Sequence, residues 1–410
     1  MSFLQILTII FISLFILWSL ICIILLILKA WIIKNGIIDN YNKDSFNKKN
    51  FLYSEIIELF NKLQDTIESG DETEEYSEIE INTGKFRVLQ GRFKALIQRL
   101  DGYGRGYVLS CLINSGLSNN PFILEDFDFS NAECEDEVFF EADLSHMIGR
   151  KVNFKNCILS EARLENAKLS SGVFAGCRFD NAKLSGAYLN DAKMQNCYFK
   201  GADLQRTYFI DSDLKQSYMA ECNLDSAIMR KVNLEYANLT SSHLYATNLS
   251  EGNLKKAILR DAFLQGATLS ETNLEGVYLT GADLDSADFW RANLSKAILI
   301  GTNFQNTYLK ETKFFGKYKD LLECNEEELD RLQEKNEIGL YSSTEDKRYS
   351  TQLSNFSKCQ WWLAEFDKDS AKTLWQYLIK NFAPPNALNL SDDEWKEFKL
   401  AEEKINKLLK

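Results

Sequence analysis

One apolar residue in every five is the dominant pattern of this chain, and it runs without interruption from Phe154 to Phe314. Its 33 successive positions hold 22 Leu, 8 Phe and 3 Met, and no polar residue. Two residues before each of them lies a second column of mostly small residues, such as Ala162, Cys177 and Ala182. An uninterrupted period this short predicts a repeat architecture.

A period of five fits neither regular secondary structure. Successive apolar residues would lie ~140° apart around an α-helix, and in a flat strand they would alternate between the two faces. The pattern fits a four-sided coil that turns a corner every five residues, with 20 residues per turn and stacked turns ~4.8 Å apart. Both apolar columns then point inward. The predicted core includes Phe154, Leu164, Phe174, Phe179, Leu184, Phe199, Leu204, Leu224, Leu244, Leu264, Leu284 and Phe304.

Other features of the repeat agree with such a coil. The three prolines of the chain lie outside it, where they remove no donor from a backbone ladder. A 20-residue turn also stacks Asn233, Asn253, Asn273 and Asn293 into one column, whose amides are expected to hydrogen-bond along the rod.

Runs such as "ADLQR", "ANLTS", "ADLDS", "ADFWR" and "ANLSK" resemble the A(D/N)LxX motif of the pentapeptide repeat family. Members of that family fold as a right-handed quadrilateral β-helix. The resemblance therefore implies an all-β solenoid of this kind over residues 121–316. It covers about half of the chain and says little about function, because the family is diverse.

The remaining sequence predicts three further regions. Residues 1–34 contain 26 uncharged, mostly apolar positions from Phe3 to Leu28, which is enough for one transmembrane helix. The lysines follow this span, which predicts a single-pass cell (inner) membrane protein with the bulk of the chain in the cytoplasm. Residues 35–120 are expected to form a helical juxtamembrane and capping region, and residues 317–410 an α-helical module that caps the second end or binds a partner.

Details of these regions give further expectations. Amphipathic helices are expected over 50–69, 85–100 and 318–336, from Trp361 to Phe382, and after a capping box at Ser391 and Glu394. The segment Asp101–Gly106 (DGYGRG) is interpreted as a turn between helices rather than a phosphate loop, because no Gly-Lys-Ser/Thr follows. The five-residue frame fails at Gly149, so the first one or two coils are expected to be irregular.

Catalytic and metal chemistry find little support in the sequence. The chain has two histidines and nine cysteines without a CxxC pair, and no HExxH or P-loop motif. Cys157, Cys177 and Cys197 fall on one side in successive coils. They are interpreted as small inward residues rather than as a metal or redox ladder. We therefore expect no enzymatic activity, no cofactor and no metal.

Outward apolar residues offer the candidate interaction surface. One column contains Ile158, Tyr198, Tyr218, Ile258, Tyr278 and Ile298, with Ile300 adjacent. Another contains Tyr188, Tyr208, Ile210, Ile228, Trp290 and Tyr308. Aromatic and β-branched residues suit strands in any case, but a contiguous exposed stripe is a candidate binding surface.

Charge separates the candidate functions. The whole chain has a net charge of −12, but residues 152–316 sum to zero. A neutral rod is a poor mimic of DNA, which carries one negative charge per ~1.7 Å. A topoisomerase-protecting DNA mimic is therefore the disfavoured alternative, and nucleic-acid binding is not expected. The sequence favours a non-enzymatic, membrane-tethered scaffold that presents a rigid surface to an unidentified protein. An enzyme or binding module in the C-terminal helices is the third possibility.

Overall fold

The computed structural model describes residue 58 and residues 83–114, 127–316, 361, 364–375, 378–379 and 392–409. The chain divides into two compact units, Met1–Leu96 and Ile97–Lys410. The predicted membrane span, the helix over 318–336 and Ser391 of the capping box lie outside the described residues. No helix within the described ranges is long and apolar enough to cross a bilayer.

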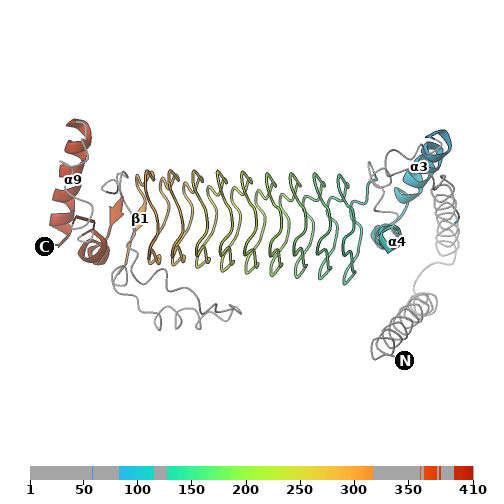
Figure 1. The fold of residues 1–410 in the computed structure, drawn as a ribbon, viewed down its shortest axis with the longest axis horizontal. Coiled ribbons are helices and arrows are strands. Elements are labelled where there is room, and N and C mark those ends of the chain that lie inside the picture. The colour runs from blue at the N-terminus through green and yellow to red at the C-terminus, as the bar shows by residue number, and fades with distance from the viewer. Residues whose placement is uncertain are drawn as a thin grey trace, which may run out of the picture. The chain divides into compact units, whose positions relative to one another are not determined.

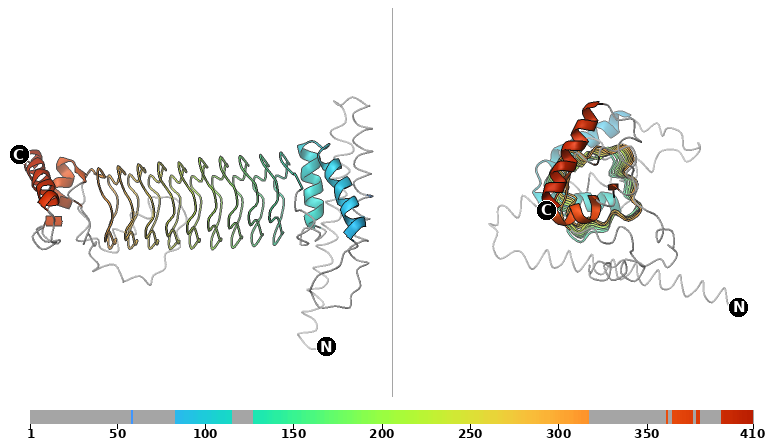
Figure 2. Two further views of the ribbon diagram at one scale, coloured as in Figure 1. Left: turned by 90° about the horizontal axis from the view of Figure 1, so that it is seen from above. Right: turned by 90° about the vertical axis from the view of Figure 1, so that its left-hand side faces the viewer.

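A four-sided β-helix fills residues 127–316, which we call the rod (Figure 1). Each outward central residue forms a parallel bridge with the residue 20 positions later, from Asp128 with Ile148 to Asn293 with Lys313. The predicted 20-residue coil is therefore confirmed. Viewed along the axis, the coils superimpose as a four-sided outline (Figure 2).

Backbone hydrogen bonds tie each coil to both of its neighbours. The amide of Asp203 donates to the carbonyl of Ala182 (2.9 Å), and the next amide, that of Leu204, donates to the carbonyl of Asn223 on the other side (2.7 Å). At the following corner the amide of Thr207 donates to the carbonyl of Leu204 (3.2 Å). The backbone amides of the coils thus find hydrogen-bond acceptors although no strand is long, which explains why so short a repeat is stable.

Corners of the rod require a left-handed backbone once in every pentad. The non-glycine residues at these positions have φ between 53° and 62°, from Ala246 to Asn131. Only glycine adopts such angles without steric cost, and Asn and Asp tolerate them better than other residues. This requirement explains the frequent Asn, Asp and Gly at one fixed position of the repeat.

The core consists of the two inward columns, and all of the predicted core residues named above have 0% exposure. Phenyl rings contact one another along the axis. Phe154 and Phe174 meet edge to face with centroids 5.7 Å apart, and Phe179 and Phe199 stack with centroids 4.9 Å apart. Hydroxyl groups in the small column bond to the backbone. Thr207 Oγ1 donates to the carbonyl of Leu184 at 2.9 Å.

The first coils are regular, so the expected irregularity at Gly149 is wrong. Ile148 forms bridges to Asp128 and to Lys168 like any other outward residue. The reason is that Met147 occupies the neighbouring small column with 0% exposure and fills the space of the missing side chain. A Cβ at Gly149 would lie only 2.5 Å from Met147 Cε.

Helix α4 (Gly102–Asn114) packs against the first coil through its glycines. The carbonyl of Gly102 accepts a hydrogen bond from the amide of Glu133 (2.9 Å), and Arg105 Nη1 donates to the carbonyl of Ser130 (2.6 Å). The expected turn at Asp101–Gly106 is therefore wrong, because glycine here allows a helix backbone to approach a coil edge. Helix α3 (Thr83–Ile97) agrees with the amphipathic helix predicted over 85–100, and Phe93 and Leu96 are buried.

A second strand continues the rod at its other end. Strand β2 (Glu365–Phe366) pairs in parallel with β1 (Lys313–Phe314), and the amide of Gly316 donates to Asp367 Oδ2 (2.9 Å). A single helix from Trp361 to Phe382 is therefore wrong. Asp367 begins a new element by capping α7 (Lys368–Ser370), which is followed by the π-helix η6 (Ala371–Trp375).

Aromatic rings connect this strand to the last helix, α9 (Asp392–Leu409). Phe366 stacks on Phe314 at 5.9 Å between centroids and contacts Trp375 at 5.3 Å. Trp375 in turn stacks on Phe398 of α9 at 6.3 Å. The C-terminal helices therefore join the rod through a continuous set of rings.

Candidate interaction faces

The rod has four outward faces, each made of residues 20 positions apart. Face 1 runs from Glu133 to Lys313, face 2 from Val138 to Ile298, face 3 from Asp143 to Asn303, and face 4 from Asp128 to Tyr308. Corner residues that directly follow each strand flank these columns. Because the backbone ladder fixes the spacing, side chains of one face lie ~4.8 Å apart from coil to coil.

Face 2 carries the predicted apolar stripe, and the structure divides it. Tyr198 is 48% exposed, and Tyr218, Tyr278 and Ile298 are half-buried. Ile258 and the adjacent Ile300 are only 7% and 8% exposed, so the expectation that they belong to an exposed stripe is wrong. The exposure of an outward side chain depends on its neighbours in adjacent coils, and periodicity alone does not show this.

Face 4 presents a second set of aromatic residues. The rings of Tyr188 and Tyr208 stack with centroids 4.7 Å apart and planes at 4°. Tyr188 is 39% exposed and Tyr308 43% exposed. At the adjoining corner the half-buried Trp290 ring lies 4.3 Å from the guanidinium carbon of Arg291. These rings are rigidly spaced and reachable from solvent.

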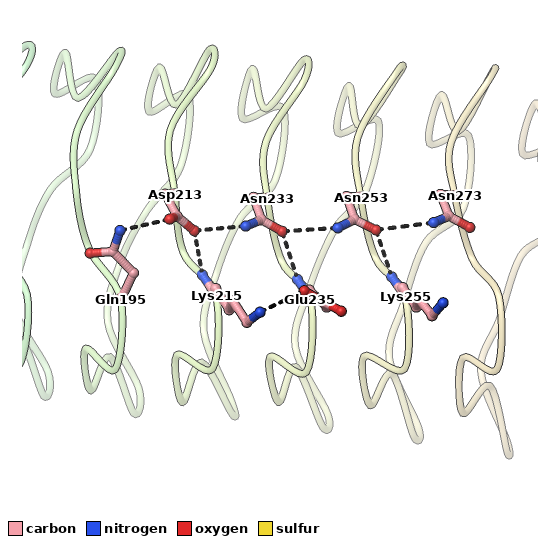
Figure 3. Close-up of polar contacts among 8 residues, drawn as sticks. All are labelled: Gln195, Asp213, Lys215, Asn233, Glu235, Asn253, Lys255 and Asn273. Atoms are coloured by element: carbon pink, nitrogen blue, oxygen red, sulfur yellow. Dashed lines mark hydrogen bonds and ion pairs between the residues drawn. The ribbon is translucent and has the colours of Figure 1, made fainter.

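Face 1 is polar and internally bonded (Figure 3). Asn253 Nδ2 donates to Asn233 Oδ1 (3.1 Å), and Asn273 Nδ2 donates to Asn253 Oδ1 (3.2 Å). Asp213 ends the series by accepting from Asn233 Nδ2 (2.9 Å) and from Gln195 Nε2 (2.6 Å). The predicted asparagine ladder is therefore confirmed, and face 1 uses its polar groups on itself.

Ion pairs between coils neutralise much of the surface charge. Lys215 Nζ lies 2.8 Å from Glu235 Oε2, and Lys255 Nζ lies 3.1 Å from Glu275 Oε2. The hydrogen bond from Lys255 lowers the pKa of Glu275 from its ordinary value. Such pairing leaves few concentrated charges along face 1.

Face 3 contains an aromatic group that sequence reasoning missed. The rings of His243 and Phe263 are in contact, tilted by 37° with centroids 4.9 Å apart, and Tyr245 follows at the adjoining corner. Tyr245 is 59% exposed and Phe263 is 42% exposed. The signal was present in the sequence, because Phe263 is the one phenylalanine in the outward central column between 153 and 313.

The stacked cysteines are structural. Cys157, Cys177 and Cys197 are buried in the small inward column, and Cys197 Sγ donates to the carbonyl of Phe174 (2.9 Å). Burial raises the pKa of Cys157 and of Cys197 to about 12. Thiols held protonated in this way are poor metal ligands and nucleophiles. No group of His, Cys, Asp and Glu in the described part of the chain could hold a metal ion.

One family model matches the repeat region of the chain. The family model described as "Pentapeptide repeats" matches eight copies within residues 138–276 and 278–314. Among curated proteins there is no match. HetL, a pentapeptide repeat protein involved in heterocyst differentiation regulation in Nostoc sp. PCC 7120, is 23% identical. Its match covers 46% of this chain and 89% of HetL, with a TM-score of 0.28.

Two further solved structures are similar. Trypsin-treated QnrB1, a plasmid-mediated fluoroquinolone resistance protein, is 18% identical over 45% of this chain and 97% of its own, with a TM-score of 0.25. Rfr23, a pentapeptide repeat protein of the cyanobacterium Cyanothece 51142, is 30% identical over 25% of this chain and 63% of its own, with a TM-score of 0.15.

Proposed function

Because the chain belongs to the pentapeptide repeat family, we propose that its rod is a non-enzymatic scaffold that presents a rigid surface to a protein partner. Pentapeptide repeat proteins are scaffold or interaction modules, and no catalytic family is indicated for this chain. The proposal further places the scaffold at a membrane, with residues 1–34 as its anchor. The partner is a cytoplasmic or membrane protein.

The exposed tyrosines on a fixed backbone carry this proposal. Tyr188 and Tyr208 on face 4 are stacked and accessible, and Tyr198 on face 2 lies under the guanidinium carbon of Arg178 at 5.5 Å from its ring centroid. Tyrosine buries a large amphipathic surface at little conformational cost, which is why it is common at binding hot spots. A rod whose backbone is fixed by the ladder loses little further entropy when it binds.

Crosslinking and pull-down of the full chain from its own membrane tests the scaffold. Tyr188→Asp places a charge on face 4 and Tyr198→Asp places one on face 2. Thr268→Asp places the same charge at a half-buried polar position of face 4 and is the matched control. We expect the tyrosine variants to reduce the recovered partner by about tenfold and the control to leave it unchanged. Equal recovery with all variants would refute the tyrosine faces as the binding surface.

The membrane anchor rests on the apolar segment from Phe3 to Leu28 and the lysines that follow it. Protease added outside intact cells is expected to leave residues 50–410 uncut, whereas protease added after lysis digests them. Digestion in intact cells would contradict the proposed orientation. Recovery of the full chain in the soluble fraction would contradict the anchor itself.

The alternative function is protection of a type II topoisomerase by DNA mimicry. The ion pairs of the rod argue against it, because Lys215, Lys255 and Arg291 each neutralise a carboxylate of a neighbouring coil. A DNA mimic needs a regular and uncompensated negative surface. A gyrase supercoiling assay with the purified chain distinguishes the two functions, since inhibition or rescue from fluoroquinolone would favour the mimic.

A further inference from the structure

The aromatic group on face 3 has no structural task in the rod. The other central residues of this face near it, such as Asn223, Asp283 and Asn303, are polar and hydrogen-bonded. His243, Tyr245 and Phe263 instead present their rings to solvent, and Tyr245 is 59% exposed. Exposed phenylalanine and tyrosine side by side mark a binding surface more often than a folding requirement.

Carboxylates border these rings on both sides along the rod. Asp225 lies one coil before Tyr245 and accepts a hydrogen bond from its backbone amide (2.9 Å). Asp283 lies one coil after Phe263 and accepts from Gln265 Nε2 (2.7 Å), and Asp285 accepts from Asn306 Nδ2 (2.8 Å). All of these donors are neutral, so the hydrogen bonds leave the negative charges in place.

Face 3 differs here from face 1, where carboxylates are paired with lysine. No Lys or Arg of the described chain forms an ion pair with Asp225, Asp283 or Asp285, whereas Glu235 and Glu275 each have a lysine within 3.1 Å. The guanidinium of Arg260, at the edge of this face, lies 3.5 Å from Asp261. Three carboxylates that form no ion pair within the described residues, Asp225, Asp283 and Asp285, therefore border the rings.

We propose that this group, His243, Tyr245 and Phe263 with Asp225, Asp283 and Asp285, binds a basic segment of a partner protein. Guanidinium and ammonium groups are attracted to the faces of aromatic rings and form strong hydrogen bonds with carboxylates. The bordering carboxylates lie three coil steps apart, roughly 14 Å, which an extended peptide spans in roughly four residues. The partner segment thus carries Arg or Lys side chains at about that spacing. The site is separate from the tyrosines of faces 2 and 4.

Selection from a phage-displayed library of random peptides against the full chain tests this site. We expect the enriched peptides to carry a net positive charge and to bind more weakly as salt is raised. Their affinity is expected to fall by about tenfold in Phe263→Ser and in Asp283→Asn, and to persist in Phe263→Tyr. Phe140→Ser, which removes another exposed phenylalanine of the rod (49% exposed), is the matched control and should bind as the parent chain does.

Several results would overturn the proposal. The selection could yield no enriched peptide, or it could enrich neutral or acidic peptides. The enriched peptides could also bind Phe263→Ser as tightly as they bind the parent chain. Because the side chains of Phe263 and Phe140 are exposed, circular dichroism should show an unchanged melting transition in the variants of these two residues. Failure here leaves the pull-down with Tyr188→Asp and Tyr198→Asp unaffected, so the two proposals stand or fall separately.

Discussion

Replacing Gly106 with alanine should open the contact between helix α4 and the first coil of the rod. A Cβ added at this position would lie 1.9 Å from the carbonyl oxygen of Glu133 and 2.6 Å from its carbonyl carbon. Neither neighbour is a flexible side chain, because both atoms belong to the hydrogen-bonded coil. The helix must therefore move away by more than 1 Å. This is roughly the difference between the 1.9 Å from the added Cβ to the Glu133 oxygen and a normal van der Waals separation.

The magnitude follows from what the helix buries. Leu109 is 0% exposed and Leu112 is 1% exposed, and burial of each contributes roughly 1.5–3 kcal/mol. A partial displacement loses part of this contribution, and alanine returns about 1 kcal/mol through its higher helix propensity. We expect a net loss of about 2–4 kcal/mol from the local stability of the helix and first coil, in the range of other overpacking substitutions.

Hydrogen exchange at the amide of Glu133 measures this loss directly, because that amide donates to the carbonyl of Gly102 across the contact. Exchange should accelerate by a factor of about 30 or more in Gly106→Ala, since each 1.4 kcal/mol is tenfold. Gly91→Ala in α3 is the matched control, because no atom lies within 4 Å of its added Cβ. An unchanged exchange rate in Gly106→Ala would refute the packing of α4 described above.

Three further outcomes follow from the rod. Ala246→Gly relieves a φ of 53° and should raise the free energy of unfolding by about 0.5–1 kcal/mol. Gly201→Ala places a Cβ 2.6 Å from Asn181 Oδ1 and should lower the free energy of unfolding. Urea unfolding measures both changes, and equal midpoints for the two variants would contradict the corner geometry. Asn253→Leu leaves Asn233 Oδ1 and Asn273 Nδ2 without their ladder partner and should cost about 1 kcal/mol on the same assay, with Asn248→Leu on face 4 as the comparison. Cys177 and Cys197 should resist iodoacetamide in the folded chain and react after denaturation, because burial raises the pKa of each thiol. Rapid alkylation of either thiol in the native protein would show that the core opens.

The sequence predicts the rod well because inward positions leave little choice. Leu204 and its equivalents must be apolar, and the small residue two positions earlier must fit beside them, so the period determines the coil before any coordinate is known. The asparagine ladder follows from the same arithmetic, since stacking by 20 residues brings like side chains together. Helix α3 was predicted from its apolar spacing to within a few residues.

The incorrect predictions have local physical causes. Gly149 indicates a failure of the five-residue frame by composition, whereas Met147 supplies the missing volume from the next column. The glycines of Asp101–Gly106 indicate a turn by composition, but close packing of α4 against a coil also requires glycine. The apolar spacing from Trp361 to Phe382 predicts one helix, whereas the unpaired edge of β1 gives residues 365–366 a ladder to join.

Surface residues were harder to predict because the coil places few demands on them. An outward central residue contributes its backbone to the ladder whatever its side chain, so Tyr198, Ile258 and Asn238 occupy the same column with exposures of 48%, 7% and 2%. Exposure there depends on neighbours in adjacent coils, and the five-residue period does not encode those contacts.

That same freedom makes the outward columns informative about function. Since the ladder and the inward residues hold the rod together, a side chain on an outward column can change with little loss of stability. Asn, Asp and Lys on faces 1 and 3 still contribute hydrogen bonds or ion pairs to neighbouring coils. Phe263 and Tyr245 contribute neither by their side chains, and they expose apolar surface that a polar residue would avoid. The folding of the rod does not account for these two residues, and a partner that covers them does.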